Sequence, residues 1–524
     1  MTKTVSSPRR TRISFLRVGV VLLCTGAVGW AGYQAVSAVA LTTATPGPSA
    51  FSAYVDVTAW PSFAFETPDG PAQSDVTLAF IVADPDQACA PSWGGYYSLE
   101  DAASELELDR RVQQLRDLGG DVRVSFGGQA NSELATVCTD PDRLLDAYRS
   151  VVERYSLTSI DLDIEGSALD DTASITRRAV AIAALQDELA SDGKALDVWL
   201  TLPVAPTGLT AAGEYAVAQA LASGVDVTGV NGMTMDFGIV TTAAEPQSEV
   251  IVQSATALHD QVSSLFTQAG QSLSDGAAWG KVGITPMIGQ NDVATERFTA
   301  ADAAVVNQFA RDHGVGLVSM WSLNRDGTCA APLPSVLTVV QTSCSGIDQD
   351  GALFAELLAA DLPGAFDTPT QDASDAPTAS STPTATPQAT AVAPADVVDD
   401  PATSPYPIWD PLGAYPAGTK IVWRHTVYQA RYWTSGFAPD TVVTNAMDSP
   451  WTLLGPVLPG DTPAPLPTLP AGSYPQWDAD EVYVAGSRVQ LGLVPYEAKW
   501  WTQGAEPGVA IEGGTPWVLI MPTG

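Results

Sequence analysis

Eight short runs rich in apolar and β-branched residues alternate with longer segments whose apolar residues recur every three to four positions. This alternation is typical of strands followed by helices that pack on a sheet. Eight such units over about 300 residues match the size of a TIM-type (β/α)8 barrel, and a doubly wound open sheet is the structural alternative. We therefore expect an α/β fold. The runs begin at residues 52, 76, 121, 158, 196, 227, 281 and 315.

The fourth run places three acids, Asp161, Asp163 and Glu165, at every second position with apolar residues between them. Alternate side chains of a strand point to one face, so these carboxyl groups should form a row with a spacing of about 6 to 7 Å. A solvated face of an antiparallel edge strand is the alternative explanation. Inside a barrel, however, three carboxylates would be costly without a task, and barrel active sites lie at the strand ends, where Glu165 falls. The row therefore favours an active site.

Residues 1–45 have the composition of an export leader. Five basic residues between positions 3 and 17 precede an apolar run from Val18 to Trp30, and residues 38–40 offer an Ala-Val-Ala cleavage site. The run is short for a membrane span, so we expect a cleaved signal and a secreted protein, with an uncleaved membrane anchor as the alternative. The formal net charge of −35 argues against a nucleic-acid partner, because nothing would neutralise the phosphates.

Four cysteines follow the leader: Cys89, Cys138, Cys329 and Cys344. An even set in an exported protein indicates disulfides, and sequence alone allows three pairings. We prefer Cys89 with Cys138 and Cys329 with Cys344, because each pair joins neighbours in the chain order. A zinc site is the weaker alternative, since the chain has no Cys-x-x-Cys spacing and only three histidines. We expect a monomer without metal or cofactor.

Composition changes abruptly near residue 366, where a Thr-, Pro- and Ala-rich stretch indicates an extended linker. After it an aromatic pattern beginning at Trp409 recurs 68 residues later, beginning at Trp477. Each copy is short and lacks cysteine, so it should be a small all-β module with a marginal core. The expected organisation is a leader (1–45), a catalytic domain (48–365), a linker (366–404), a first module (405–458), a Pro-rich spacer (459–472) and a second module (473–524).

Adjacent aromatic residues in each copy, Tyr432 with Trp433 and Trp500 with Trp501, predict a binding surface. Neighbouring residues on a strand face opposite ways, so a thin module cannot bury both members of a pair. Exposed flat aromatics are suited to stacking on sugar rings or on a partner. The alternative is that both belong to the core or to its hydrophobic cover.

The acid row resembles the DxxDxDxE signature of family 18 glycoside hydrolases, the chitinases and their relatives. Three further stretches resemble family motifs in the same order: Ser125–Gly128, Met233–Asp236, and Trp321, which corresponds to the tryptophan that floors the cleavage subsite. The two repeats resemble the short chitin-binding modules of families 5 and 12. Together these resemblances imply a chitinase that acts on chitin or related N-acetylglucosamine polymers.

The resemblance also implies roles for the acids. Glu165 would be the general acid, which must stay protonated near neutral pH, and nearby like charges favour that state. The substrate's own N-acetyl oxygen would attack the anomeric carbon with net retention. Asp163 would orient the acetamide, Asp161 would share a proton with Asp163, and Asp236 would contact the same region.

The sequence departs from the family pattern at two places. Thr158 and Ser159 replace its first Asp-Gly, and Met235 replaces a tyrosine that hydrogen-bonds the acetamide. Asn231 or Gln290, at the ends of the sixth and seventh strands, are candidates for that role. The expected substrate contacts are Ser125, Asn231, Met233, Met235, Gln290 and Trp321.

Two other functions remain as alternatives. One is an endo-β-N-acetylglucosaminidase acting on N-glycan cores, against which two modules of chitin-binding type argue. The other is a catalytically inactive chitin-binding lectin on the same fold, against which the intact acid row argues.

Overall fold

The computed structural model describes residues 49–242, 245–365, 399–411, 413–441, 443, 448–463, 466–509 and 515–520. The expected leader and residues 366–398 of the expected linker lie outside these ranges. In the described part of the chain, no helix combines the length and apolar character needed to cross a membrane.

All eight predicted runs form strands, and every neighbouring pair of them is parallel. Their order in the sheet follows the chain from β3 to β14 without reversal, which excludes the doubly wound arrangement. β1 (Ala50–Phe51) pairs with β14, while β2, which follows after Ser52 alone, pairs with β3. The residues from Ala50 to Asp56 therefore pair with the last strand through β1 and with the second strand through β2. The eight strands are β2 (Ala53–Asp56), β3 (Asp75–Ala83), β6 (Asp121–Gly127), β7 (Ser159–Asp163), β8 (Asp197–Ala205), β10 (Val227–Met233), β11 (Val282–Thr285) and β14 (Leu317–Val318).

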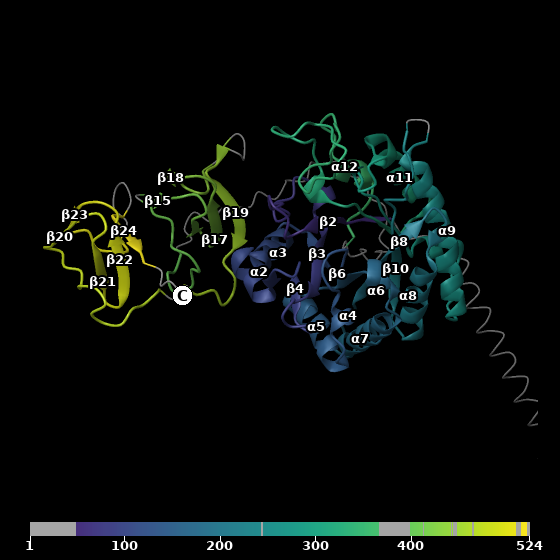
Figure 1. Ribbon diagram of the computed structural model, residues 1–524, viewed down its shortest axis with the longest axis horizontal. Coiled ribbons are helices and arrows are strands. Elements are labelled where there is room, and N and C mark those ends of the chain that lie inside the picture. The colour runs from purple at the N-terminus through teal and green to yellow at the C-terminus, as the bar shows by residue number, and fades with distance from the viewer. Residues whose placement is uncertain are drawn as a thin grey trace, which may run out of the picture.

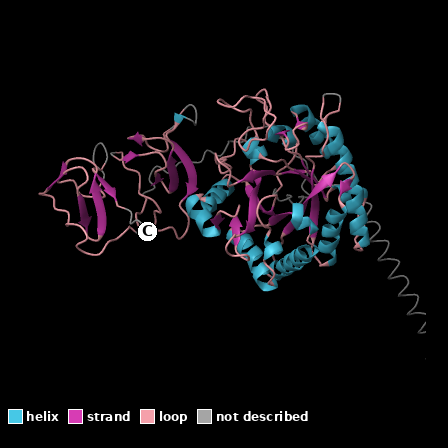
Figure 2. Ribbon diagram, viewed as in Figure 1, coloured by secondary structure: helices cyan, strands magenta, loops and turns pink. Residues whose placement is uncertain are grey.

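Helices follow most strands and lie outside them (Figure 2). Local signals set their ends: Thr299 and Asp302 form a capping box at the start of α11, and Gly314 ends that helix in the left-handed conformation. The helices are α2 (Leu99–Glu105), α3 (Leu108–Asp117), α4 (Leu134–Val137), α5 (Pro141–Arg154), α6 (Gly166–Asp170), α7 (Thr172–Ser191), α8 (Ala211–Ala222), α9 (Gln247–Gln268), α10 (Asp275–Trp279), α11 (Ala300–His313) and α12 (Phe354–Ala359). Short elements complete this α/β domain: β4 (Pro91–Trp93), β5 (Tyr97–Ser98), β9 (Gly208–Leu209), β12 (Gly289–Gln290), β13 (Arg297–Phe298), η1 (Pro71–Gln73) and η2 (Leu323–Arg325).

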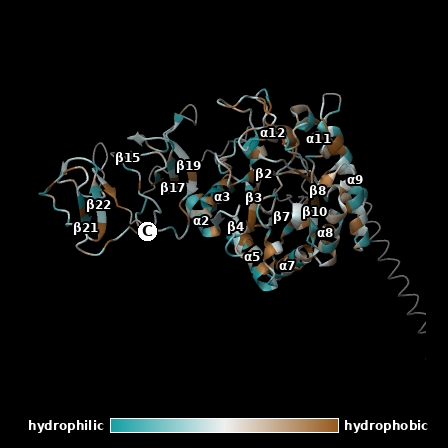
Figure 3. Ribbon diagram, in the orientation of Figure 1, coloured by the Kyte–Doolittle hydropathy of each residue, from teal (hydrophilic) through white to brown (hydrophobic). Residues whose placement is uncertain are grey.

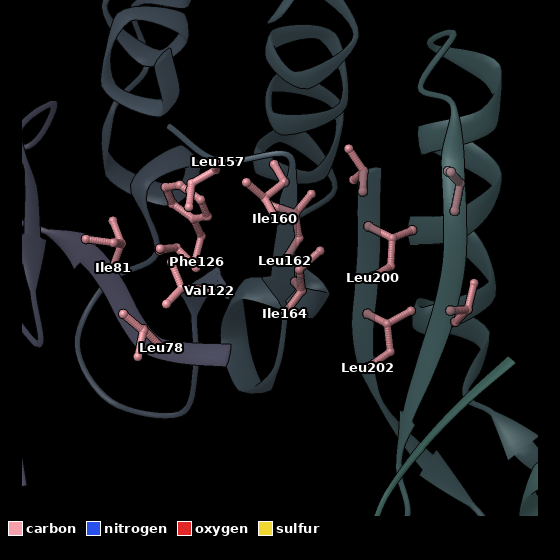
Figure 4. Close-up of a cluster of buried hydrophobic side chains, with 14 of the residues drawn as sticks. Leu78, Ile81, Val122, Phe126, Leu157, Ile160, Leu162, Ile164, Leu200 and Leu202 are labelled. Atoms are coloured by element: carbon pink, nitrogen blue, oxygen red, sulfur yellow. The ribbon is translucent and has the colours of Figure 1, made fainter. Parts of the chain in front are cut away.

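The core of the α/β domain lies between the strands and the surrounding helices. On β7, Ile160 and Leu162 point into this layer, followed by Ile164 after the strand, among buried residues of the neighbouring strands (Figure 4). β3 and its neighbours are mostly hydrophobic, whereas the helices carry both hydrophobic and hydrophilic residues (Figure 3). Both preferred disulfides form, Cys89 with Cys138 and Cys329 with Cys344. The predicted pairing is thus confirmed.

Two small β modules with the same topology follow the α/β domain (Figure 1). Each has a three-stranded antiparallel sheet and a two-stranded one, and a buried tryptophan in each donates to an equivalent carbonyl. Asp399 accepts hydrogen bonds from the backbone of Arg424 and His425, so the first module includes contacts from the segment expected to be linker. Their strands are β15 (Ala414–Tyr415), β16 (Lys420–Trp423), β17 (Thr426–Ala430), β18 (Thr434–Ser435) and β19 (Trp451–Pro456), then β20 (Val482–Tyr483), β21 (Arg488–Leu491), β22 (Val494–Ala498), β23 (Thr502–Gln503) and β24 (Trp517–Leu519).

Candidate active site

The acid row lies on the inner face of the sheet. Asp161 and Asp163 are 1% and 4% exposed, while Glu165, just past the end of β7, is half-buried. The apolar residues between them face the helices, as strand alternation requires. Burial of the first two acids excludes the solvated strand face.

Three hydroxyl groups donate hydrogen bonds to the carboxyl group of Asp161. Its Oδ2 accepts hydrogen bonds from Tyr54 at 2.8 Å and Ser125 at 2.6 Å, and its Oδ1 accepts one from Thr201 at 2.5 Å. Burial raises the pKa of Asp161, and the bonds from Ser125 and Thr201 oppose that rise. The buried Arg123 lies close enough to act in the same direction.

Asp163 is the least satisfied acid of the row. Its Oδ1 is buried without a hydrogen-bond partner in the described structure. Burial raises its pKa well above the ordinary value, and the charges of Glu165 and Asp161 raise it further. A buried polar oxygen without a partner is costly, so its position facing a cavity indicates that a bound molecule supplies the partner.

Glu165 is placed to exchange a proton with a bound molecule. Burial raises its pKa to about 7. Its backbone is extended, at the point where β7 ends and α6 begins. A carboxyl group that keeps its proton near neutral pH and lines an open cavity can serve as a general acid.

Asp163 and Glu165 face one cavity of about 150 Å³ at the carboxyl ends of the strands. One wall is aromatic: Phe80 and Trp321 stack with ring centres 5.4 Å apart, and Tyr54 lies 6.0 Å from Trp321. Thioethers of Met233, Met235 and Met287 form another part of the wall. The lining residues are Tyr54, Phe80, Gln129, Asp163, Glu165, Thr201, Met233, Met235, Asp236, Thr285, Met287, Asp292 and Trp321.

Two glycines at the end of β6 let the chain pass close to this wall. A Cβ on Gly127 would lie 1.9 Å from the carbonyl oxygen of Asp163, and one on Gly128 would lie 2.9 Å from the Phe80 ring. Both have positive φ, and the amide of Gly128 donates to the Asp163 carbonyl at 3.0 Å. The glycine pair therefore holds β6 against the acid row and the aromatic wall.

Asp236 occupies the cavity on the side of β10. Its φ of 53° is left-handed, and its Oδ1 accepts a hydrogen bond from the amide of Val293 at 2.8 Å. Burial raises the pKa of Asp236, and this hydrogen bond opposes the rise. The buried Glu296 accepts bonds from the amides of Phe237 and Ile239, which fixes the loop just after Asp236.

Three expected substrate contacts do not line the cavity. Ser125 binds Asp161 from within the sheet, and Asn231 bridges Thr201 and Thr285 through bonds of 3.0 and 2.8 Å. Gln290 is fully buried: its amide donates to backbone carbonyls and its oxygen accepts from Arg297 at 2.9 Å. Asn231 and Gln290 are thus hydrogen-bonded within the protein, and neither of them lines the cavity near Met235.

The structure adds residues that the sequence did not single out. Tyr54, Phe80 and Thr201 reach the cavity from strand positions that belong to none of the family motifs, and Gln129 and Asp292 reach it from loops. A strand pattern marks which residues face inward but not which of them border an opening. For Tyr54, the sequence did offer one signal, because strand alternation places this residue on the inward face.

Two strongly exposed aromatics stand on the same side of the domain as the cavity. Trp60 follows β2 and is 85% exposed, and Tyr96 lies in the β4–β5 turn and is 77% exposed. Gly94 connects this turn to the aromatic wall, because its amide donates to the Phe80 carbonyl and its Cβ position would contact Thr58 and Tyr96. The two rings are therefore candidates for contacts beyond the cavity.

In the modules, both members of each aromatic pair are exposed. The exposed fractions are 48% for Tyr432, 64% for Trp433, 44% for Trp500 and 61% for Trp501. The expectation that at least one member of each pair is exposed is confirmed. Within the described residues, no group of three or more His, Cys, Asp or Glu side chains could hold a metal ion.

No protein-family model matches the chain. It is 39% identical over 265 residues to the probable bifunctional chitinase/lysozyme of Escherichia coli (strain K12), covering 49% of this chain and 29% of that protein. It is 38% identical over 274 residues to endochitinase 11 of Metarhizium anisopliae, covering 51% and 49%. The chain thus spans less than half the length of either curated relative.

Among solved structures, the catalytic domain of a hyperthermophilic chitinase from Pyrococcus furiosus matches with 26% identity and a TM-score of 0.50, over 60% of this chain and 95% of that one. The α/β domain resembles chitinase catalytic domains. The two modules are too short to supply a match of this extent. In both comparisons the chain is similar to chitinases, which the sequence motifs also resemble.

Proposed function

We propose that the protein is a chitinase whose α/β domain, a closed (β/α)8 barrel, hydrolyses β-1,4 bonds between N-acetylglucosamine units. The observation that carries this proposal is the pairing of two unlike acids in one cavity: Glu165, with a pKa of about 7, and Asp163, with an unpartnered oxygen. The similarity to chitinase catalytic domains supports the same activity.

The first step needs a proton donor, because the oxygen of a glycosidic bond is a poor leaving group. Glu165 gives its proton to this oxygen as the bond to the anomeric carbon breaks. The substrate's acetamide oxygen attacks the same carbon and forms a cyclic oxazolinium ion. Water then attacks that carbon, Glu165 takes the proton from water, and the ring opens with net retention.

Asp163 acts on the acetamide during this step. Its free Oδ1 can accept the acetamide N–H, which turns the acetamide oxygen toward the anomeric carbon. Burial and the neighbouring charges raise the pKa of Asp163, which supports the proposal that Asp163 and Asp161 share a proton before substrate binds. The three hydroxyl groups around Asp161 stabilise its charge when that proton moves to Asp163.

The cavity walls suit an N-acetylated sugar. The apolar face of a sugar ring can stack on Trp321, which Phe80 supports from behind. The thioethers of Met233 and Met235 offer an apolar, deformable surface for the acetamide methyl group. Asp236 borders the same space as a hydrogen-bonding group.

We further propose that the protein is exported and that both modules bind chitin. The two disulfides suit an oxidising compartment outside the cell, which is also where the proposed substrate polymer would be met. The exposed aromatic pairs suit stacking on the sugar rings of an insoluble surface.

The test compares substrates on the purified full chain. We expect release of short oligosaccharides from colloidal chitin, no cleavage of a high-mannose glycoprotein, and a β-anomeric product detected first by NMR. A Glu153→Gln variant changes an exposed carboxylate outside the cavity and serves as the matched control for Glu165→Gln. Glycan release from the glycoprotein without attack on chitin, or an initial α-anomer, would overturn the proposal.

A further inference from the structure

Two charged residues on the outer side of α3 are buried. Glu107, just before the helix, is 3% exposed and Arg110 is 5% exposed, although the opposite face of the helix, with Leu108, Val112 and Leu115, is the one that packs in the core. Glu107 also has a left-handed φ of 53°, an uncommon state for glutamate that persists only where surrounding contacts fix it. The first module covers these residues: β19 lies beside α3 (Figure 1).

Glu107 is the centre of the contact. Its Oε1 accepts from Lys420 of the first module at 2.7 Å and from the hydroxyl of Tyr406, while its Oε2 accepts from Arg110 at 2.9 Å. Lys420 donates in addition to the carbonyl of Ser104 at 3.1 Å. A buried carboxylate is tolerated only with such partners, and two of its three donors come from the module.

Arg110 makes the second half of the contact. Its Nη1 donates to Asp461 at 2.9 Å and to the carbonyl of Pro456 at the end of β19. Asp461, at the start of the spacer, also accepts from the amide of Leu458 at 2.7 Å, so the acid is oriented by the end of the first module. Each side therefore provides one anion and one cation, and the charges balance across the contact.

Gly455 lets the two surfaces approach. A Cβ at this position would lie 2.6 Å from the carbonyl oxygen of Arg110 and 3.1 Å from Cβ of Gln114. The aligned position of the second module is Met521, which lies outside the described residues. The first module thus has glycine at the point where its backbone passes close to the backbone of α3.

The second module has the same scaffold without the contact. Its residue aligned with Lys420 is Arg488, which pairs at 2.8 Å with Glu497 on the adjacent strand. In the first module Gln429 stands in place of Glu497, so Lys420 has its acidic partner on the α/β domain. Among the described residues, the hydrogen bonds and ion pairs of the second module stay within residues 469–520.

Burial of the neighbouring residues does not separate the two modules. Val422 and Val427 share the face of Lys420 and are fully buried, packed against Tyr406 and Val457 of their own module. The aligned Gln490 and Pro495 of the second module are buried as well. The ion pairs, not the burial of this face, therefore distinguish the first module.

We propose that the first module is docked on α3 as a fixed part of the α/β domain, whereas the second module is held by its spacer. Docking gives Tyr432 and Trp433 a constant direction relative to the cavity. The second aromatic pair is then free to reach different parts of a surface. The proposal concerns how the chain holds itself and does not depend on which polymer is bound.

The test measures distances within the full chain, with Cys24 replaced by serine. Spin labels are placed at Ser191→Cys in the α/β domain and at Ser435→Cys in the first module, or at the aligned Gln503→Cys in the second; all three positions are exposed. We expect a narrow distance distribution from position 191 to 435 and a broad one from 191 to 503. A broad distribution in the first pair overturns the proposal.

Charge reversal identifies the contact. Lys420→Glu places a second carboxylate beside Glu107 and should broaden the 191–435 distribution, whereas the matched Arg488→Glu change should leave it unchanged. Glu107→Gln, which alters the α/β domain and leaves the module sequence intact, should broaden it as well. If Lys420→Glu and Glu107→Gln both keep the narrow 191–435 distribution, Glu107 does not hold the module. Circular dichroism checks that each variant is folded.

Discussion

The cavity of the α/β domain and the aromatic surfaces of the modules break the usual burial pattern in opposite directions. In the cavity, acids are buried: Asp161 and Asp163 lie inside a parallel sheet. In the modules, large aromatic rings such as Trp433 and Trp501 are left in water. Either arrangement lowers the stability of the folded state, so both point to sites kept for binding or chemistry.

The size of each core explains the difference. The α/β domain has one extensive apolar core, which can tolerate two buried carboxyl groups. Each module has a core of only a few residues around one tryptophan, and an unpaired buried charge would unfold it. A small module can bind through exposed rings, whereas acid chemistry with raised pKa values needs a large domain.

The largest effect is expected from Glu165→Gln, which should lower the rate of chitin hydrolysis by about 10² to 10⁴ while leaving retention on chitin unchanged. The amide keeps the shape of the carboxyl group but has no proton to give to the glycosidic oxygen. Initial rates on a short soluble oligosaccharide and pull-down on chitin beads measure the two properties. Near-parental hydrolysis would remove Glu165 from the mechanism.

The next effect concerns the modules. Trp433→Ala or Trp501→Ala should each weaken retention on insoluble chitin partly, and the double variant more strongly, because two linked weak sites can add about 10² to 10⁴ in avidity. Turnover of soluble oligosaccharides should not change. Retention that survives in a folded double variant would move the binding surface to Tyr432 and Trp500.

The pH dependence separates the cavity from the modules. With a pKa of about 7, Glu165 should lose its proton above neutrality, so kcat/KM on soluble substrate should fall about tenfold per pH unit on the alkaline side. Retention by the modules, which rests on neutral rings, should stay level over the same range.

The free energy of unfolding of the α/β domain should also depend on the titration of Glu165. The folded pKa of Glu165 lies above its unfolded value, so the folded state holds the proton between about pH 4 and 7 and unfolding releases it. Stability should therefore decline as pH rises through this window, and the Glu165→Gln variant should show a flatter profile in urea denaturation. An equal decline in parent and variant would contradict the assignment.

A smaller effect separates two neighbouring acids. Asp163→Asn should stabilise the protein at pH 8, because burial and the charges of Glu165 and Asp161 oppose an ionised carboxyl group at this position. Asp161→Asn should destabilise it instead, since three hydroxyl groups lose their carboxylate acceptor. Thermal unfolding of both variants at pH 8 tests the opposite signs, and shifts in the same direction would refute the argument.

The smallest effect is expected at the edge of the cavity. Trp60→Ala should reduce hydrolysis of polymeric chitin by about two- to tenfold, the range for one lost aromatic stacking contact, and leave the shortest substrates unaffected. Val180→Ala changes an exposed apolar side chain on α7, outside the cavity lining, and provides a control. Equal losses on short and long substrates would place Trp60 in the structure of the fold rather than on the polymer path.

The sequence predicted what depends on local periodicity. It identified the eight strands, the inward acid row and the disulfide pairs, because each follows from alternation, spacing or chain order. It did not predict that Gln290 turns inward to its own hairpin, since the direction of a loop depends on partners such as Arg297 that are not implied by the strand pattern. Phe80 was missed for a similar reason: it looks like any apolar strand residue until Gly128 and Trp321 are brought beside it.

The docking of the first module was also beyond the sequence pattern. Lys420 and Arg488 are equivalent in the repeat, and nothing local distinguishes the one that binds Glu107 from the one that pairs within its own sheet. The informative difference is that the first module has Gln429 where the second has Glu497. Its meaning is clear only when the facing surface of α3 is known.

Gly455 means that the two copies of the repeat are not interchangeable. A side chain at this position would push β19 away from Arg110, so the first copy has to match a surface outside the module as well as its own fold. The aligned residue of the second copy is methionine, and the space beside Arg110 and Gln114 has no room for its side chain. Placed in the first position, the second copy would lack this close approach to α3.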